Sequence, residues 1–114
     1  MTITQELDTL ITSLGLPVET GVFSGKAPEQ YVIVTPLGDT FALHCDNRPE
    51  YETQEARLSL YSKGNYLARK RQIVKALLQA GFTVTDRRYI GLETDTKYHH
   101  FSCDASKIYN IWEE

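Results

Sequence analysis

The stretch that decides the fold is residues 51–82, YETQEARLSLYSKGNYLARKRQIVKALLQAGF. Its first half alternates small or apolar side chains with polar ones, which is the period-2 pattern of a strand that buries one face. Ala56, Leu58 and Leu60 would lie on the buried face, and the polar residues between them on the other. The pattern predicts a strand over residues 51–61.

The second half of this stretch predicts an amphipathic helix over residues 66–80. Asn65 suits the position before a helix, because its side-chain oxygen can accept a free backbone N–H of the first turn. Gly81 suits the position after the helix, where a positive φ is favoured, and Phe82 would open the next strand. The apolar stripe holds Leu67, Ile73, Val74, Leu77 and Leu78, and the basic residues Arg69, Lys70, Arg71 and Lys75 occupy most of the remainder.

The composition, with 41% hydrophobic and 24% charged side chains in 114 residues, is that of one ordinary globular domain. No apolar run approaches the roughly 18 residues that span a bilayer, and no basic-then-apolar signal region opens the chain. We therefore expect a single domain over residues 1–114, made inside the cell, with no membrane partner. Cys45 and Cys103 fit free thiols in a reducing compartment, although one disulfide between them is also compatible with the sequence.

The charges are unevenly distributed along the chain, although the net charge is only −3. Residues 1–55 hold nine acidic and two basic side chains, whereas residues 56–92 hold eight basic side chains and one acidic one. Such a division favours head-to-tail packing of identical subunits, in which an acidic surface meets a basic one. The alternative is that the two halves neutralise each other within one subunit.

A helix and up to three strands are predicted before the central stretch. Apolar residues recur with helical spacing over residues 3–14, and Thr2 with Gln5 would form a capping box at the start of this helix. Residues 18–23 fit a short strand. Strands over residues 31–35 and 41–45 would form a hairpin that turns at Pro36 and Gly38, followed by a polar loop over residues 46–50.

After the central stretch, the sequence predicts two more strands. The first covers residues 82–90 and is interrupted by the charged residues 86–88. A hairpin tip over residues 93–96 leads to the last strand, residues 98–103, and a C-terminal tail follows over residues 103–114. Short connections between strands imply a mostly antiparallel sheet. The predicted fold class is therefore α+β, with two helices packed on one face of that sheet.

Residue types that bind metals or act as nucleophiles are present, but their pattern does not favour a catalytic site. In a strand, His99 and Cys103 would share a face with Phe101, which indicates a core position. The sequence has no local metal knuckle, no glycine-rich phosphate loop and no nucleophile elbow. We therefore expect neither enzyme activity nor a cofactor. The metal-capable residues are His44, Cys45, His99, His100 and Cys103.

The basic face of the 66–80 helix has three interpretations. It can be a solvated surface, it can contact phosphates of a nucleic acid, or it can contact the carboxylates of a neighbouring subunit. The acidic composition of the whole chain, and the absence of aromatic residues beside the basic cluster, argue against a nucleic-acid surface. A small cytoplasmic nucleic-acid-binding or regulatory protein that uses this helix remains the alternative function.

Residues 51–63, YETQEARLSLYSK, the helix that follows and the Ala80-Gly81-Phe82 ending resemble a pattern found in the tail terminator proteins of siphophages. These are also called tail completion or tail-to-head joining proteins. Members typically have an N-terminal helix, a hairpin, a strand of the form xLxLYSK, a helix with an AGF exit and an aromatic-rich last strand. The resemblance covers roughly residues 1–103, and residues from Asp104 onward have no counterpart in it.

This resemblance implies a phage structural protein of α+β fold that assembles into a hexameric ring in the virion. The ring would cap the tail tube, stop its polymerisation and present a face to the connector proteins of the neck. Its partners would be other copies of itself, the tail tube protein and a neck protein, while phage DNA only passes through the lumen. For the contact between subunits we expect basic residues of the 66–80 helix to face acidic residues of the neighbour. They are Arg69, Arg71 and Lys75 on one side and Glu50, Glu52 and Glu55 on the other.

Overall fold

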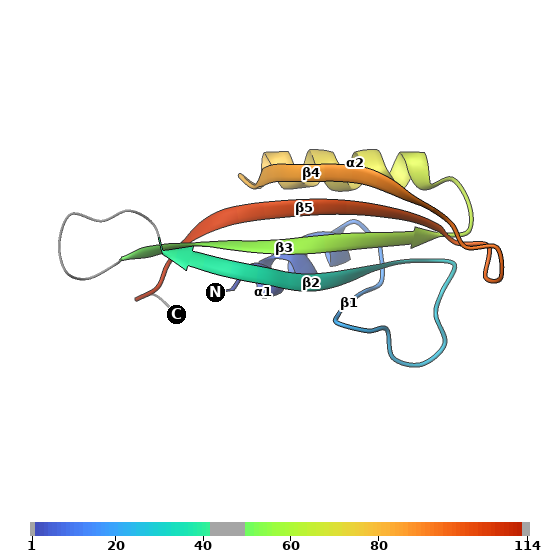
Figure 1. Cartoon of the computed structure of the whole chain (residues 1–114), viewed down its shortest axis with the longest axis horizontal. Helices are drawn as coiled ribbons and strands as arrows, with labels where there is room; N and C mark the ends of the chain where they lie inside the picture. Colours follow the sequence, from blue (N-terminus) through green and yellow to red (C-terminus); the bar gives the residue numbers. More distant parts are fainter. Residues whose placement is uncertain (1, 42–49, 113–114) are drawn as a thin grey trace.

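The computed structural model of the protein describes residues 2–41 and 50–112, which form one five-stranded sheet and two helices. The strand order in the sheet is β1-β2-β3-β5-β4, and every neighbouring pair is antiparallel except the parallel pair β1–β2 (Figure 1). The predicted α+β class is confirmed. The elements are α1 (Ile3–Ser13), β1 (Val18–Thr20), β2 (Gln30–Phe41), β3 (Tyr51–Ser62), α2 (Tyr66–Gln79), β4 (Thr83–Leu92) and β5 (His99–Asn110).

The helix boundaries are set by the local signals that the sequence carries. The Asn65 side chain accepts the backbone N–H of Leu67 at 3.2 Å, and Gly81 after α2 has a φ of +87°. At the start of α1, Thr2 and Gln5 form the reciprocal pair of hydrogen bonds of a capping box. Both helices therefore begin where the sequence predicts and end within one residue of the predicted positions.

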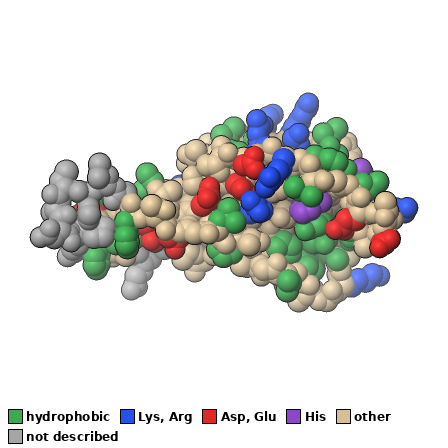
Figure 2. Space-filling view, viewed as in Figure 1, with side chains coloured by type: hydrophobic (Ala, Val, Ile, Leu, Met, Phe, Trp, Pro, Cys, Tyr) green, Lys and Arg blue, Asp and Glu red, His purple; other side chains and the backbone are tan. Residues whose placement is uncertain are grey.

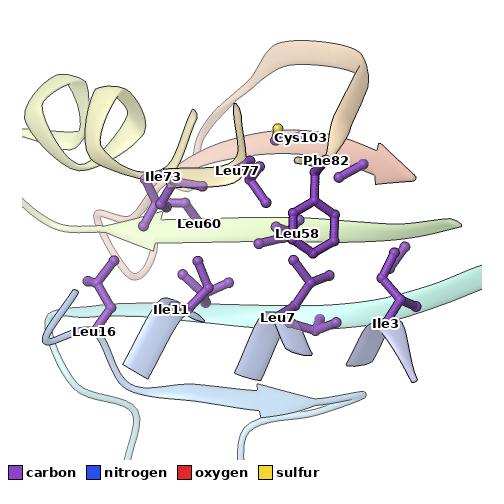
Figure 3. Packing of buried hydrophobic residues seen from close by; sticks show 14 of the residues in the cluster. Ile3, Leu7, Ile11, Leu16, Leu58, Leu60, Ile73, Leu77, Phe82 and Cys103 are labelled. Carbon is purple, nitrogen blue, oxygen red and sulfur yellow. The ribbon is translucent and has the colours of Figure 1, made fainter. Parts of the chain in front are cut away.

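Both helices pack on the same face of the sheet, and one continuous apolar core fills the space between them. Figure 3 shows Leu7 and Ile11 of α1, together with Leu77 of α2, gathered over Leu58 of the central strand β3. Burial of this apolar surface is the main source of stability in such a fold. The residues that the strands contribute to this core are Val32, Val34, Ala56, Leu58, Leu60, Phe101, Cys103 and Ala105.

The predicted hairpin that turns at Pro36 and Gly38 is wrong. β2 continues through this position to Phe41, and its antiparallel partner is β3 along its whole length. Between Pro36 and Gly38 the register shifts, so that the turn-like sequence forms a β-bulge. Proline is tolerated here because β1 ends at Thr20 and leaves this side of β2 as an edge. Residues 42–45 of the predicted second strand and 46–49 of the predicted loop lie outside the described residues.

The C-terminal half of the sheet is more regular than predicted. β4 runs without interruption through the charged residues 86–88, although its register with β5 shifts on either side of them. β5 continues to Asn110, so the predicted C-terminal tail over residues 103–114 belongs largely to the sheet. The reason is long-range pairing: the second half of β5 lies against the first half of β3, with Ile108 opposite Thr53.

The molecule is elongated, about 53 Å long and 26 Å by 22 Å across. The outer parts of three strands, residues 36–41, 51–55 and 106–110, form the narrow end of the molecule, and we call these parts the arm (Figure 1). α1 contacts the base of the arm through Gln54 and Lys107. Within the described residues, neither helix is long and apolar enough to cross a membrane.

A candidate subunit interface on two opposite sides of the sheet

A cleft of about 330 Å³ lies where α2 meets the edge strand β4, and cations surround it. Arg87 of β4 lies opposite Cys103, whose side chain belongs to the core, so Arg87 faces the helix side of the sheet. The ammonium group of Lys70 lies 5.3 Å from the centre of the Phe101 ring, as in a cation–π contact. The residues that line the cleft are Lys70, Arg71, Val74, Lys75 and Arg87.

Two cations of this cluster repel each other along α2. Arg71 and Lys75 are one helical turn apart, and like charges at this spacing destabilise a helix by roughly 0.2–0.5 kcal/mol. α2 has no acidic residue from Tyr66 to Gln79 that would offset the repulsion. Leu67 and Leu78 lie on the same outward face of α2 as Arg71 and Lys75, at its two ends, and they are 51% and 58% exposed. The outer surface of α2 is therefore cationic in its middle and apolar at its two ends.

Arg69, predicted with Arg71 and Lys75 to face a neighbouring subunit, is engaged within the chain. Its guanidinium donates to Gln30 Oε1 at 3.0 Å, to the carbonyl of Leu14 at 3.2 Å and to Gln72 Oε1 at 3.0 Å. These bonds join α2 to the end of α1 and to the start of β2. Arg69 therefore holds the two helices in place, whereas Arg71 and Lys75 are exposed.

The three predicted acceptors do not form one cluster. Glu55 Oε2 accepts a hydrogen bond from Thr85 Oγ1 at 3.1 Å, and Glu52 Oε1 accepts one from Gln54 Nε2 at 3.0 Å. Because Glu52 and Glu55 are three residues apart on β3, their side chains point to opposite faces of the sheet. Glu50, just before β3, is exposed.

An acidic surface that sequence reasoning missed lies on the same face of the sheet as the cation cleft, but at the opposite edge. A hollow of about 290 Å³ between α1 and β1 is lined by Thr4, Gln5, Asp8, Glu19 and Thr20. Asp8 is exposed and makes no hydrogen bond or ion pair with any residue in the described part of the chain. One signal was available in the sequence, because residues 2–25 contain no lysine or arginine.

The remaining acid of α1 is neutralised within the fold. Glu6 accepts from the Lys107 ammonium at 2.5 Å and from the Tyr109 hydroxyl at 2.9 Å, and both partners lie on β5. Burial, together with the hydrogen bond to Glu6, raises the pKa of Tyr109 well above its ordinary value. Glu6 therefore fastens α1 to the sheet, and Asp8 carries the outward charge beside α1, because Glu19 follows the core-facing Val18 on β1 and points to the open face.

The open face of the sheet, opposite to the helices, is balanced in charge. Arg57 Nε and Nη2 bind the two carboxylate oxygens of Asp104 at 2.8 and 3.1 Å, and Arg88 lies 3.4 Å from Asp86. Figure 2 looks onto this face and shows acidic and basic side chains side by side across its middle. In the same view, lysine and arginine side chains stand on the upper edge, over α2 and β4.

The metal-capable residues that the structure describes lie on different faces of β5. The Nδ1 atom of His99 is 2.9 Å from the Tyr89 hydroxyl on the helix side, while His100 stacks on Tyr61 on the open face at 4.4 Å between ring centres. Burial lowers the pKa of His100. Cys103 is a free thiol in the core, and burial raises its pKa to about 11, which disfavours the reactive thiolate.

Across residues 2–41 and 50–112, no three histidine, cysteine or acidic side chains are placed to hold a metal ion together. His44 and Cys45 lie outside these described residues.

Comparison of the sequence with models of protein families and with curated proteins found no match. The fold and the charge distribution are therefore the observations on which a function has to be argued.

Proposed function

We propose that this protein is a phage tail terminator, a structural protein without enzyme activity. Six copies form a closed ring that caps the tail tube, stops its polymerisation and joins the tail to the neck of the head. Its partners are other copies of itself, the tail tube protein and a neck protein, and its final location is the virion. The sequence resemblance over residues 51–63 suggests this function, and the charge distribution of the fold supports it.

The observation that carries the proposal is the separation of unpaired charge onto the two opposite edges of one sheet, basic at one edge and acidic at the other. The α2–β4 edge presents Arg71, Lys75 and Arg87, and the α1–β1 edge presents Asp8, with Glu19 at the same edge but on the open face. A closed ring of identical subunits needs two different, complementary patches on each copy. A two-fold dimer formed through one of these edges alone would instead place that patch against itself, and like charges would meet.

The arm offers a further surface for the tube or the neck. Phe41 at the end of β2 is 64% exposed, and Ile108 of β5 is 60% exposed, so large apolar side chains face solvent far from the core. Exposed apolar groups on a projecting element are typical of protein contact sites. The arm also carries Asp39, Glu52 and Glu55, and acidic groups turned toward a lumen would repel DNA and let it pass.

Removal of the gene from the phage that encodes the protein tests this function. Tails are expected to lose their uniform length and to fail to join heads, and the wild-type gene supplied in trans should restore both properties. Electron microscopy of purified particles gives the length distribution. Tails of normal length that join heads without the protein would contradict the proposal.

The cation cleft favours one other function, which is binding to a nucleic acid. Four cations around one cleft offer contacts to phosphates, and such binding would weaken steeply as salt concentration rises. Titration of the protein with labelled double-stranded and single-stranded DNA at several salt concentrations distinguishes the two functions. Binding that is lost on replacing Arg71, Lys75 and Arg87 of the cleft by glutamine would favour this alternative.

A further inference from the structure

We infer that the cation cleft between α2 and β4 of one subunit receives the acidic α1–β1 side of the next subunit, with Asp8 as the main contact. This inference rests on the ring assembly proposed above and assigns its two surfaces. It differs from the expectation drawn from the sequence, which placed Glu50, Glu52 and Glu55 in that role.

The topology places the two surfaces where a head-to-tail contact needs them. β1 and β4 are the two outermost strands of the sheet, and α1 and α2 lie over opposite halves of the same face. With about 4.8 Å between neighbouring strands, the two edges are roughly 19 Å apart. Each copy therefore presents a donor side and an acceptor side that do not overlap, and successive copies can use both at once.

The chemistry of the two surfaces is complementary. Arginine binds a carboxylate through two parallel hydrogen bonds, and Arg71 and Arg87 lie on either side of the cleft. An incoming carboxylate would also remove the repulsion between Arg71 and Lys75 on α2. Asp8 is the acid best suited to enter, because the carboxylate of Glu19 is already held by the backbone N–H and hydroxyl of Ser24, both at 2.8 Å.

Apolar contacts would add to these charges. Leu67 and Leu78 stand at the two ends of the outer stripe of α2, and Val74 forms the apolar floor of the cleft. On the other side, α1 presents the small polar residues Thr4, Thr9 and Thr12 beside Asp8, and these allow a close approach of two helices. A contact between copies would bury the two exposed leucines, which make no contribution to the core of a single subunit.

Reciprocal charge reversal tests this contact. One variant carries Arg71→Glu and Lys75→Glu, and the other carries Asp8→Lys and Glu19→Lys. In each variant alone, like charges would meet at every contact, and we expect the concentration needed for assembly to rise at least about tenfold. Mixed one to one, the variants should assemble again as alternating subunits, three of each in a ring of six. Native mass spectrometry and sedimentation equilibrium measure both effects.

Controls separate the contact from a general effect of charge or folding. Lys26→Glu and Asp95→Lys reverse exposed charges outside both surfaces, and these variants should assemble like the wild type. If Glu19→Lys disturbs the Ser24 loop, Asp8→Lys alone replaces the double variant. Circular dichroism verifies that each variant is folded before it is mixed.

Four outcomes would overturn the inference. The first is that either reversed variant assembles alone, and the second is that their mixture stays dissociated. The third is that a Glu52→Lys and Glu55→Lys variant, in place of the α1–β1 variant, restores assembly of the Arg71→Glu and Lys75→Glu variant. The fourth is that the wild-type protein stays monomeric at about 1 mM. Failure of the mixing experiment alongside abnormal tails on gene removal would refute the contact and keep the function. Success of the mixing experiment together with normal tails after gene removal would support the contact and refute the function.

Discussion

The two helices pack on the same face of the same sheet, and each turns one charged side chain inward, but the charges that they leave exposed have opposite signs. α1 turns Glu6 inward to Lys107 and Tyr109, so that its strongest polar contacts hold it to the sheet. α2 turns only Arg69 inward and leaves Arg71 and Lys75 exposed beside each other. The structure of a single subunit explains Glu6 and Arg69, but it does not explain the exposed charges, which are Asp8 on α1 and Arg71 and Lys75 on α2.

This difference separates residues that stabilise the fold from residues that are available for contact. Exposed ion pairs contribute about 0–1 kcal/mol each, so leaving Arg71 and Lys75 without acidic partners among the described residues costs a single subunit little. On α2 the cations stand beside exposed leucines, and on α1 the nearest unpaired acid is Asp8. Each helix therefore offers two nearby residues of the same type, one turned inward and one exposed, and the effects of replacing them can be compared.

The largest effect is expected from the two adjacent leucines of α2. Leu77 is fully buried and Leu78 is 58% exposed. Leu77→Ala should lower the free energy of unfolding by about 2–5 kcal/mol, because it removes core contacts and leaves a cavity. Leu78→Ala should change it by less than about 0.5 kcal/mol and should weaken self-association instead. Urea unfolding and sedimentation measure the two quantities, and equal losses of stability would contradict the assignment of an inner and an outer face.

A smaller effect is expected from the two acids of α1. Glu6→Gln leaves the half-buried Lys107 ammonium without its opposite charge and should cost about 1–3 kcal/mol of unfolding free energy. Asp8→Asn should leave stability within about 0.5 kcal/mol of the wild type, because Asp8 has no partner within the described chain. Thermal and urea unfolding give both values. A destabilised Asp8→Asn variant would show that this carboxylate serves the fold and is not reserved for a neighbour.

The smallest effect concerns pH and the Tyr109 hydroxyl that binds Glu6. Its pKa is raised in the folded protein, so the unfolded chain loses this proton first as pH rises above about 10. Stability that is complete below pH 10 should therefore fall above it, by at most about 1.4 kcal/mol per pH unit for this one group. Tyr109→Phe should remove that contribution to the slope. Urea unfolding at pH 9, 10 and 11 compares the two proteins, and parallel pH profiles would show that folding does not raise the pKa of Tyr109.

The fold could be predicted where its signals are local. Asn65, Gly81 and the Thr2–Gln5 pair act on residues within one turn, and they placed both helices. The sequence Pro36-Leu37-Gly38 also looks like a local signal, but the long pairing of β2 with β3 turns it into a bulge. A turn motif competes with strand pairing, and only the partner strand decides the outcome.

The candidate site could be predicted only in part, for the same reason. The basic residues of α2 are contiguous in the sequence, so Arg71 and Lys75 were found, whereas Arg87 joins them only because β4 folds beside α2. The inward role of Arg69 depends on Leu14, 55 residues away, and that of Glu6 on Lys107, 101 residues away. The acidic hollow between α1 and β1 exists only once β1 pairs in parallel with β2.

Electron cryomicroscopy of the head-proximal end of assembled tails tests the central claim most directly. A closed ring of six copies at the end of the tube is predicted, with α2 and β4 of each copy against α1 and β1 of the next. A different copy number at that position, or a tube end that lacks the protein, would contradict the proposed function.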